Sequence, residues 1–303
     1  MLNFRRILVP LNLTDLDATV LRYVSMFCSR ESVEKLYFLH AERRLDLPEQ
    51  VIEEYPELVQ PLDEYARSKM DALIRQHFHP GKEVEQEIEV IPGQPVDVIL
   101  HHAVQKEIDL IVVGRKVDAR ETRRLPVRLT RKAPCPVWVV PAAFPPQISK
   151  ILVPVDFSEL SVLAMETAVH LARLMNLEAV YCLHSFSLPS DYYQTGKSEE
   201  EFTAILRQHT EREFDQFLSR FEHAGVQILP EIVREKRPTT AIETFIENNE
   251  VDLVVMGARG RTPATALLMG SVTEHVLLHS SIPVLAVKKK GMGLHLLKAL
   301  LKI

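Results

Sequence analysis

The stretch Ile151-Leu-Val-Pro-Val-Asp156 decides the fold of this chain, because nearly the same residues occur close to its start, as Ile7-Leu-Val-Pro-Leu-Asn12. Both halves also close on an apolar run after a Pro-Val step, at Pro136-Val137 and at Pro283-Val284. A repeat of this length indicates two domains of one architecture, and 303 residues are enough for both.

Short apolar runs alternate with longer amphipathic segments in each half. Runs such as Leu253-Val-Val-Met256 are continuously apolar and β-branched, which is typical of strands covered on both faces of a parallel sheet. The segment after Asp156 has a helical stripe of Leu and Ala residues, and Ser158 is placed to cap it. We therefore predict an α/β fold of two tandem doubly wound layers, each with five strands and four helices. The expected strands are 6–11, 36–41, 86–91, 109–113 and 136–140, then 151–155, 178–184, 228–233, 252–256 and 283–287.

The domain boundaries follow from the repeat. We place the first domain at 1–144, the second at 148–290 and an amphipathic tail at 291–303. The linker between the domains, residues 141–148, is short and proline-rich, so it is a semi-rigid spacer and the domains are expected to pack on each other. The acidic stretches 49–64 and 198–215 are expected to form solvated surface helices.

Bulk composition limits the class of protein. A net charge of −5 gives no support for nucleic-acid binding. The three cysteines, Cys28, Cys135 and Cys182, form no CxxC pair and are expected to be buried reduced thiols. No signal-peptide core and no apolar run of membrane-spanning length is visible, which predicts a cytoplasmic protein without integral membrane segments.

A glycine-rich loop follows the fourth expected strand of the second half. It reads Gly257-Ala-Arg-Gly260, then nine residues, then Gly270-Ser271 at the start of an expected helix. Glycines let backbone N–H groups approach a phosphate, and a helix N-terminus favours an anion. The alternative is that the glycines only turn the chain and that Ser271 only caps the helix, with capping-box spacing to Glu274.

Asp156 ends the first strand at the same sheet edge as this loop. Its carboxylate could accept hydrogen bonds from a ribose or a base, or it could cap the following helix. Arg259 and Arg261 flank the second glycine and could reach phosphates, although loop arginines are often solvated.

The loop closely resembles the ATP-binding signature of the universal stress protein family, G-x2-G-x9-G-[ST], and the resemblance extends over both halves. It implies an adenine nucleotide alpha hydrolase-like sheet of order 3-2-1-4-5 and an ATP ligand, with or without Mg²⁺. It also implies that 136–140 pairs with 283–287, so that the two domains form an intrachain pseudo-dimer. Carried over by position, the nucleotide-binding residues are Pro154, Val155, Asp156, Ser185, Met256, Gly257, Arg259, Gly260, Gly270, Ser271, Val272 and Thr273.

The first half departs from this signature. Asn12 stands in place of Asp156, Val117 lies near the position of Gly260, and Arg123-Arg124 fall where Gly270-Ser271 are. We predict that the first domain does not bind ATP in the family manner. The segment 115–132, which we expect to be a basic loop, contains eight basic and two acidic residues and could attract an anion, a nucleic acid or an acidic protein partner. The alternative is a solvated basic helix.

Three functions remain open on the sequence. The chain is an ATP-binding stress-response regulator with little or no turnover, a slow ATPase, or a scaffold that binds a partner at 115–132 or at the tail. The tail either packs on its own domain or a sister chain, or contacts a membrane surface. Gly196-Lys-Ser198 lacks the first glycine of a Walker A loop, and the pairs His77/His79 and His101/His102 have no carboxylate or cysteine at ligand spacing, so no metal site is predicted.

Overall fold

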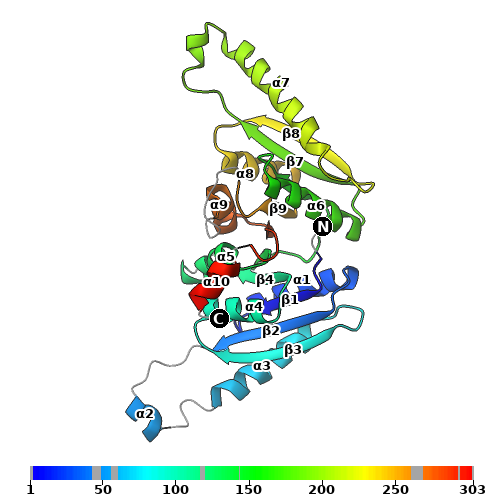
Figure 1. Ribbon diagram of the computed structural model, residues 1–303. Helices are drawn as coiled ribbons and strands as arrows, with labels where there is room; N and C mark the ends of the chain where they lie inside the picture. The colour runs from blue at the N-terminus through cyan, green and yellow to red at the C-terminus, as the bar shows by residue number, and fades with distance from the viewer. Residues whose placement is uncertain are drawn as a thin grey trace. The chain divides into compact units, whose positions relative to one another are not determined.

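The computed structural model describes residues 3–42, 49–55, 61–116, 120–142, 144–260, 269–292 and 294–301. The chain divides into two compact units. The second unit along the chain is Ile148–Lys288, which contains the second repeat. The first unit is Leu2–Gln147 together with Lys289–Ile303, so the C-terminal tail belongs with the first repeat and not with the second (Figure 1).

The first unit contains a parallel sheet in the order β3-β2-β1-β4-β5, the order that the family resemblance implies. Its strands are β1 (Arg6–Pro10), β2 (Lys35–Glu42), β3 (Glu85–Pro92), β4 (Leu110–Arg115) and β5 (Val137–Pro141). The helices along this part of the chain are α1 (Leu16–Arg30), α2 (Glu49–Glu54), α3 (Pro61–His77), α4 (Pro95–Gln105) and α5 (Arg120–Lys132).

The second unit repeats the arrangement, with the order β8-β7-β6-β9-β10. Its strands are β6 (Ile151–Pro154), β7 (Ala179–Phe186), β8 (Gln227–Arg234), β9 (Leu253–Gly257) and β10 (Val284–Val287). Between them are α6 (Glu159–Leu174), the 3-10 turn η2 (Tyr192–Thr195), α7 (Glu199–Leu218), α8 (Pro238–Asn249) and α9 (Ser271–His279).

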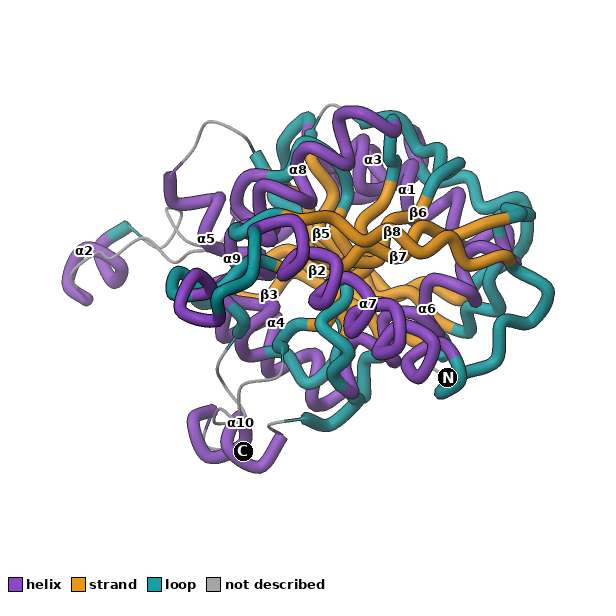
Figure 2. The backbone as a smooth tube through the Cα atoms, turned by 90° about the horizontal axis from the view of Figure 1, so that it is seen from above, coloured by secondary structure: helices purple, strands orange, loops and turns teal. Residues whose placement is uncertain are grey.

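The apolar runs form these strands because both faces of each sheet are covered by helices (Figure 2). Ile151, Leu152 and Val153 of β6 are fully buried. On the neighbouring α6, Ser158 is the N-cap, and its Oγ accepts a hydrogen bond from the Ser161 N–H at 3.3 Å, as expected. The helical stripe is also confirmed, since Leu160, Ala164, Ala168 and Leu171 are buried.

Two segments of like charge form helices. The acidic stretch 198–215 lies at α7, whose N-terminus has a full capping box between Ser198 and Glu201. The basic segment 115–132 was predicted as a loop or a helix, and the loop interpretation is wrong for residues 120–132, which form α5. Arg115 ends β4 and is buried, while 117–119 lie outside the described residues. The helix forms because its apolar positions Val127 and Leu129 are buried.

The tail also differs from expectation. Helix α10 (Leu294–Leu301) follows β10, yet it contacts α4 of the first unit. It therefore packs on the other repeat, whereas the sequence suggested its own domain, a sister chain or a membrane. Among the described residues no helix is both long and apolar enough to cross a membrane.

Candidate functional site

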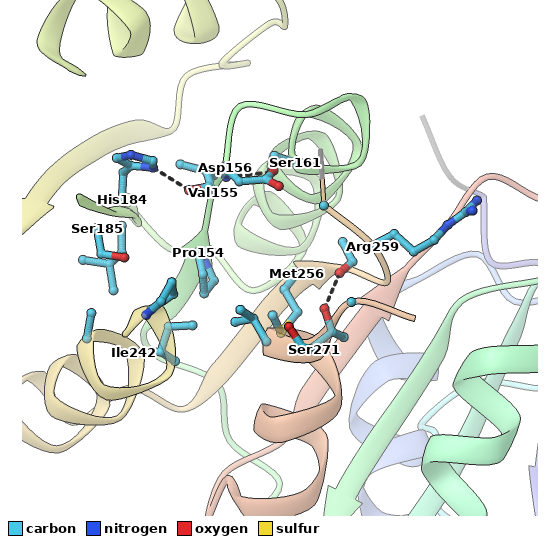
Figure 3. Close-up of a pocket in the computed structure, with 18 of the residues that line it drawn as sticks. Pro154, Val155, Asp156, Ser161, His184, Ser185, Ile242, Met256, Arg259 and Ser271 are labelled. Carbon is cyan, nitrogen blue, oxygen red and sulfur yellow. Dashed lines mark hydrogen bonds between the residues drawn. The ribbon is translucent and has the colours of Figure 1, made fainter. Parts of the chain in front are cut away.

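Three strand ends and two helix starts of the second unit enclose a pocket of about 530 Å³. The carboxyl ends of β6, β7 and β9 form its floor, and the first turns of α8 and α9 form its walls (Figure 3). Ligands of open α/β sheets bind at this edge, and the volume is in the range of small-molecule sites.

The residues carried over from the family signature meet in this pocket. All twelve carried-over positions line the pocket: Pro154, Val155, Asp156, Ser185, Met256, Gly257, Arg259, Gly260, Gly270, Ser271, Val272 and Thr273. Seven further lining residues were not among those expected from the sequence: Ser161, Leu183, His184, Pro238, Ala241, Ile242 and Met269.

The residues that were missed form much of the apolar wall. Ala241 and Ile242 come from the first turns of α8, and Pro238 is its first residue. A helix after a parallel strand begins at the edge where that strand ends, and proline favours the first helical position. The sequence Pro238-Thr-Thr-Ala-Ile242 therefore carried a signal for this wall. Together with Leu183 and Met256, the start of α8 forms an apolar surface that could pack against a flat ring.

Asp156 both builds the turn after β6 and faces the pocket. Its Oδ1 accepts hydrogen bonds from the Ser161 Oγ at 2.7 Å and from the Ser158 N–H at 3.1 Å. Its Oδ2 lies against Gly260, where an added Cβ would collide with it. The carboxylate is thus fixed by α6 and touches the glycine loop, so the structural and the binding interpretation of Asp156 are compatible.

His184 closes the pocket beside Asp156. Its Nδ1 lies 2.8 Å from the Val155 carbonyl oxygen, which can only accept, so Nδ1 carries the proton (Figure 3). The ring stacks on Phe157 with centroids 4.5 Å apart. Phe157 has a φ of 62°, a conformation that is strained for a bulky residue. Aromatic packing therefore holds both the turn and the histidine in place.

The glycine loop leads into the N-terminus of α9. Gly270 is the N-cap, with φ −65° and ψ 141°, and no side chain of the described residues caps this end. Ser271 is therefore the first helical residue, and the interpretation of Ser271 as a cap with a box to Glu274 is wrong. The N–H groups of Ser271, Val272 and Thr273 belong to the first turn, where an α-helix has no internal acceptors. With the helix dipole, they form a site that favours an anion.

Two side chains expected near phosphates have other roles in this structure. The Thr273 hydroxyl donates to the Gly257 carbonyl oxygen at 2.8 Å, so its single proton ties α9 to the end of β9. The guanidinium of Arg259 is directed away from Asp156, Met256 and Ser271, although the residue lines the pocket (Figure 3). Arg261 lies outside the described residues. Backbone groups, more than side chains, define the anion site.

Gly257 and Gly270 of the loop differ in whether packing requires a glycine at their position. A Cβ on Gly257 would lie 2.8 Å from the Leu160 Cβ, and Gly114, at the same place in the first repeat, would come 2.6 Å from the Leu16 side chain. Helix packing therefore requires the glycine that both repeats keep. A Cβ on Gly270 would meet described atoms only at 3.6 Å or more, and its dihedral angles suit any residue. Packing against the described residues therefore does not require glycine at 270, and a side chain is absent where the loop borders the pocket.

The first repeat uses the equivalent crevice differently. Asn12 stands where Asp156 is, and Asp17 stands where Ser161 is. The buried Asp17 carboxylate accepts hydrogen bonds from the N–H groups of Asn12 and Thr14 at 3.0–3.2 Å. Burial raises the pKa of Asp17, and these backbone bonds oppose the rise. The carboxylate of this turn has moved from the crevice to the protein interior.

Metal binding finds no support in the part of the chain that the structure describes. Histidine, cysteine and acidic side chains there form no group of three that could hold a metal ion. Gly196-Lys-Ser198 lies between η2 and α7, and its serine caps α7, which agrees with its rejection as a phosphate loop. The three cysteines are buried, as expected.

Fold and pocket define a class of tandem doubly wound α/β proteins with a small-molecule site at the strand ends of the second repeat. The profile of the universal stress protein family matches residues 3–141 and 147–288. The chain therefore belongs to the universal stress protein family, with two family domains in tandem.

Relatives and solved structures agree with this assignment. The chain is 28% identical over 274 residues to the universal stress protein E homolog of Haemophilus influenzae, which covers 85% of this chain and 83% of the relative. A universal stress protein of Methanocaldococcus jannaschii is 32% identical over 141 residues, 46% of this chain and 82% of the relative.

The crystal structure of a universal stress protein from Archaeoglobus fulgidus superposes with a TM-score of 0.61 at 20% identity, over 94% of this chain and 98% of that one. A functionally unknown protein from Pseudomonas aeruginosa gives 0.66 at 19%, over 99% and 97%. At these identities the structures support the fold alone.

Proposed function

We propose that the second repeat binds ATP and that the protein is an ATP-dependent stress-response regulator with little or no turnover. The observation that carries the proposal is the composition of the pocket. One end has the uncapped N-terminus of α9 with an unobstructed Gly270, and the other has an apolar wall beside the Asp156 carboxylate. The helix N-terminus suits a phosphate chain, the apolar wall suits an aromatic base, and the carboxylate suits the hydroxyl groups of a ribose.

The residues suggest one orientation for the nucleotide. The phosphates lie at the N–H groups of Ser271, Val272 and Thr273, where Gly270 leaves room. The base packs against Leu183 and Ile242, and the ribose hydroxyls donate to Asp156. Asp156 is the only carboxylate among the residues found to line the pocket. Any Mg²⁺ that accompanies ATP is therefore held mainly by phosphates and water, as is common for this ion.

Low turnover is proposed because Asp156 and His184, the two lining side chains that could act as a base, are engaged by other groups of the protein. Asp156 Oδ1 accepts from Ser158 and Ser161, and the Nδ1 proton of His184 is directed at the Val155 carbonyl. Hydrolysis needs a positioned base for water. A slow ATPase is the alternative, and it predicts repeated phosphate release that stops in Asp156→Ala. Release at the background rate would remove this alternative.

The proposal is tested by calorimetry of the full chain with ATP. We expect one ATP per chain. Asp156→Asn should weaken binding about 10- to 100-fold, the effect of losing a charged hydrogen-bond acceptor. Asn12→Asp is the matched control, because it makes the opposite exchange in the first repeat and should leave ATP affinity unchanged. Absence of binding at millimolar ATP would refute the proposal.

A scaffold function is the remaining alternative, and one observation favours it. Helix α5 presents the exposed cations Arg124 and Arg128 to solvent, where an acidic partner could bind. It predicts a partner that is lost when these charges are reversed. A cytoplasmic location belongs to the main proposal, since buried thiols and an ATP ligand both suit that compartment.

A further inference from the structure

The chain segment after β10 leaves the second repeat and ends on the first. We propose that the first repeat has become the docking site for the chain's own C-terminal segment, residues 289–301, and that this docking links the first repeat to the phosphate loop of the second. The link to the phosphate loop rests on the proposed function, whereas the docking does not.

The first anchor of the segment is Lys290. Its Nζ lies 2.5 Å from Asp109 Oδ1 and 3.1 Å from the Glu107 carbonyl oxygen. The Asp109 side chain is only 12% exposed, and its other oxygen accepts the Arg6 N–H at 2.8 Å. Glu107 has a φ of 51°, so the turn that presents its carbonyl has a defined, strained shape. The receptor for the lysine is therefore fixed by the turn before β4 and by β1.

The second anchor is Gly291. Its N–H donates to the Pro134 carbonyl oxygen at 2.8 Å, and its φ of 79° favours glycine at this position. The turn continues with the Leu294 N–H donating to the Gly291 carbonyl oxygen at 3.0 Å, and α10 begins there. Leu297 is then 1% exposed, and α10 contacts α4. The ion pair of Lys290, the turn at Gly291 and the buried Leu297 together form a specific interface with the first unit.

The interface explains why so short a helix is stable. A helix of this length is marginal alone in water, so it needs a surface. Leu297, on the apolar face of α10, is buried in the structure of the chain itself. The surface that this leucine needs is therefore supplied by the first unit.

The linker before β6 is anchored on the same unit. The Thr19 hydroxyl donates to the Ala142 carbonyl oxygen at 3.1 Å, and the Tyr23 hydroxyl donates to that of Pro145 at 2.5 Å. Both segments that flank the second repeat are therefore held by the first repeat. Such a role requires no nucleotide loop, which is consistent with the loss of the signature there.

A short hydrogen-bonded route joins the docked segment to the pocket. The Gly270 N–H donates to the Ala258 carbonyl oxygen at 3.0 Å, and the Ala258 N–H donates to that of Val287 at 2.8 Å. Only two residues separate Val287 from Lys290, so their Cα atoms lie at most about 10 Å apart. A ligand that orders the loop at Gly270 should therefore also order the docked segment.

Hydrogen exchange on the full chain tests the docking without nucleotide. In Asp109→Asn the Gly291 amide and the α10 amides should exchange about tenfold faster than in the wild type, the effect of weakening a charge-assisted bond. Glu250→Gln, at an 89% exposed side chain of the second unit, is the control and should change nothing there. Equal exchange in wild type and Asp109→Asn would overturn the docking.

A truncated chain that ends at Lys288 gives an independent measurement. A labelled peptide of residues 287–303 should bind it, and the same peptide with Leu297→Asp should bind at least about tenfold more weakly, because the leucine is buried. Equal binding of both peptides, or none to a truncated chain that keeps the native fluorescence of Trp138, would overturn the docking. If the truncated chain does not fold, the exchange experiment decides.

The coupling is tested by adding ATP. Exchange at Gly291 should slow by about threefold or more when ATP binds, and the effect should be absent in Gly270→Ala. Calorimetric binding of ATP with unchanged exchange at Gly291 would overturn the coupling and leave the proposed function intact. No calorimetric binding at all would refute the proposed function, while the ligand-free exchange still decides the docking.

Discussion

A buried histidine in the first repeat provides a quantitative test of the structure. His102 of α4 is 3% exposed, and its ring meets Tyr37 edge-to-face at 5.6 Å. Burial, with a further contribution from Lys106, lowers the pKa of His102 from 6.5 to about 4. The second repeat has Phe245 at the same position, against Tyr181 at 5.3 Å. The substitution His102→Phe therefore inserts the residue that this fold already accommodates.

The magnitude follows from the two pKa values. Below pH 6.5 the unfolded chain binds a proton at His102, whereas the folded chain stays neutral down to about pH 4, so the free energy of unfolding falls as the pH falls. A pKa difference of about 2.5 corresponds to a limit of about 3.4 kcal/mol, and to about 2 kcal/mol at pH 5 relative to pH 8. His102→Phe removes this loss.

Urea denaturation followed by Trp138 fluorescence measures the free energy of unfolding of the first unit, because this buried residue is the only tryptophan and lies in β5. Asp17 and Glu89 have raised pKa values, which stabilise the fold toward acid and act against His102. The informative quantity is therefore the stability difference between His102→Phe and wild type. It should grow by about 2 kcal/mol from pH 8 to pH 5. A difference that stays constant with pH would refute the reasoning.

Three further predictions concern the repeat and its pocket. Gly114→Ala and Gly257→Ala should each lower the free energy of unfolding by about 1–3 kcal/mol in denaturation, since the added Cβ meets Leu16 or Leu160. Gly270→Ala should leave the melting temperature unchanged and weaken ATP binding. Asp17→Ala should lower the free energy of unfolding by about 1–3 kcal/mol, because the part-buried N–H groups of Asn12 and Thr14 lose their acceptor; an unchanged denaturation midpoint contradicts this. Ser161→Ala should reduce ATP affinity in calorimetry by releasing Asp156, and equal affinity would exclude that positioning role.

Much of the fold was predictable because its signals are local in sequence. Continuous β-branched runs such as Leu253-Val-Val-Met256 specify buried parallel strands, and the observed strand ends differ from the predicted ones by at most two residues. The glycine loop was also recognisable, because backbone approach and a helix start require particular residues at particular spacings. Its position after the fourth strand placed it at the ligand-binding edge without any tertiary information.

Other features depend on contacts between distant residues, which no local pattern encodes. The apolar wall from α8 joins the pocket only because β8 ends at the same edge as β6. Similarly, the two loop glycines can be told apart only by their packing. An added Cβ on Gly257 would collide with Leu160 of α6, whereas one on Gly270 would meet described atoms only at 3.6 Å or more.

Local sequence patterns were enough to predict two α/β repeats and one intact loop, because strand periodicity and loop glycines act over a few residues. The packing of the tail on the first repeat depends on tertiary contacts. The amphipathic pattern of α10 requires some apolar partner surface but does not say which one. That choice depends on Asp109 and Pro134, which lie far from the tail in sequence and meet it only in the folded chain.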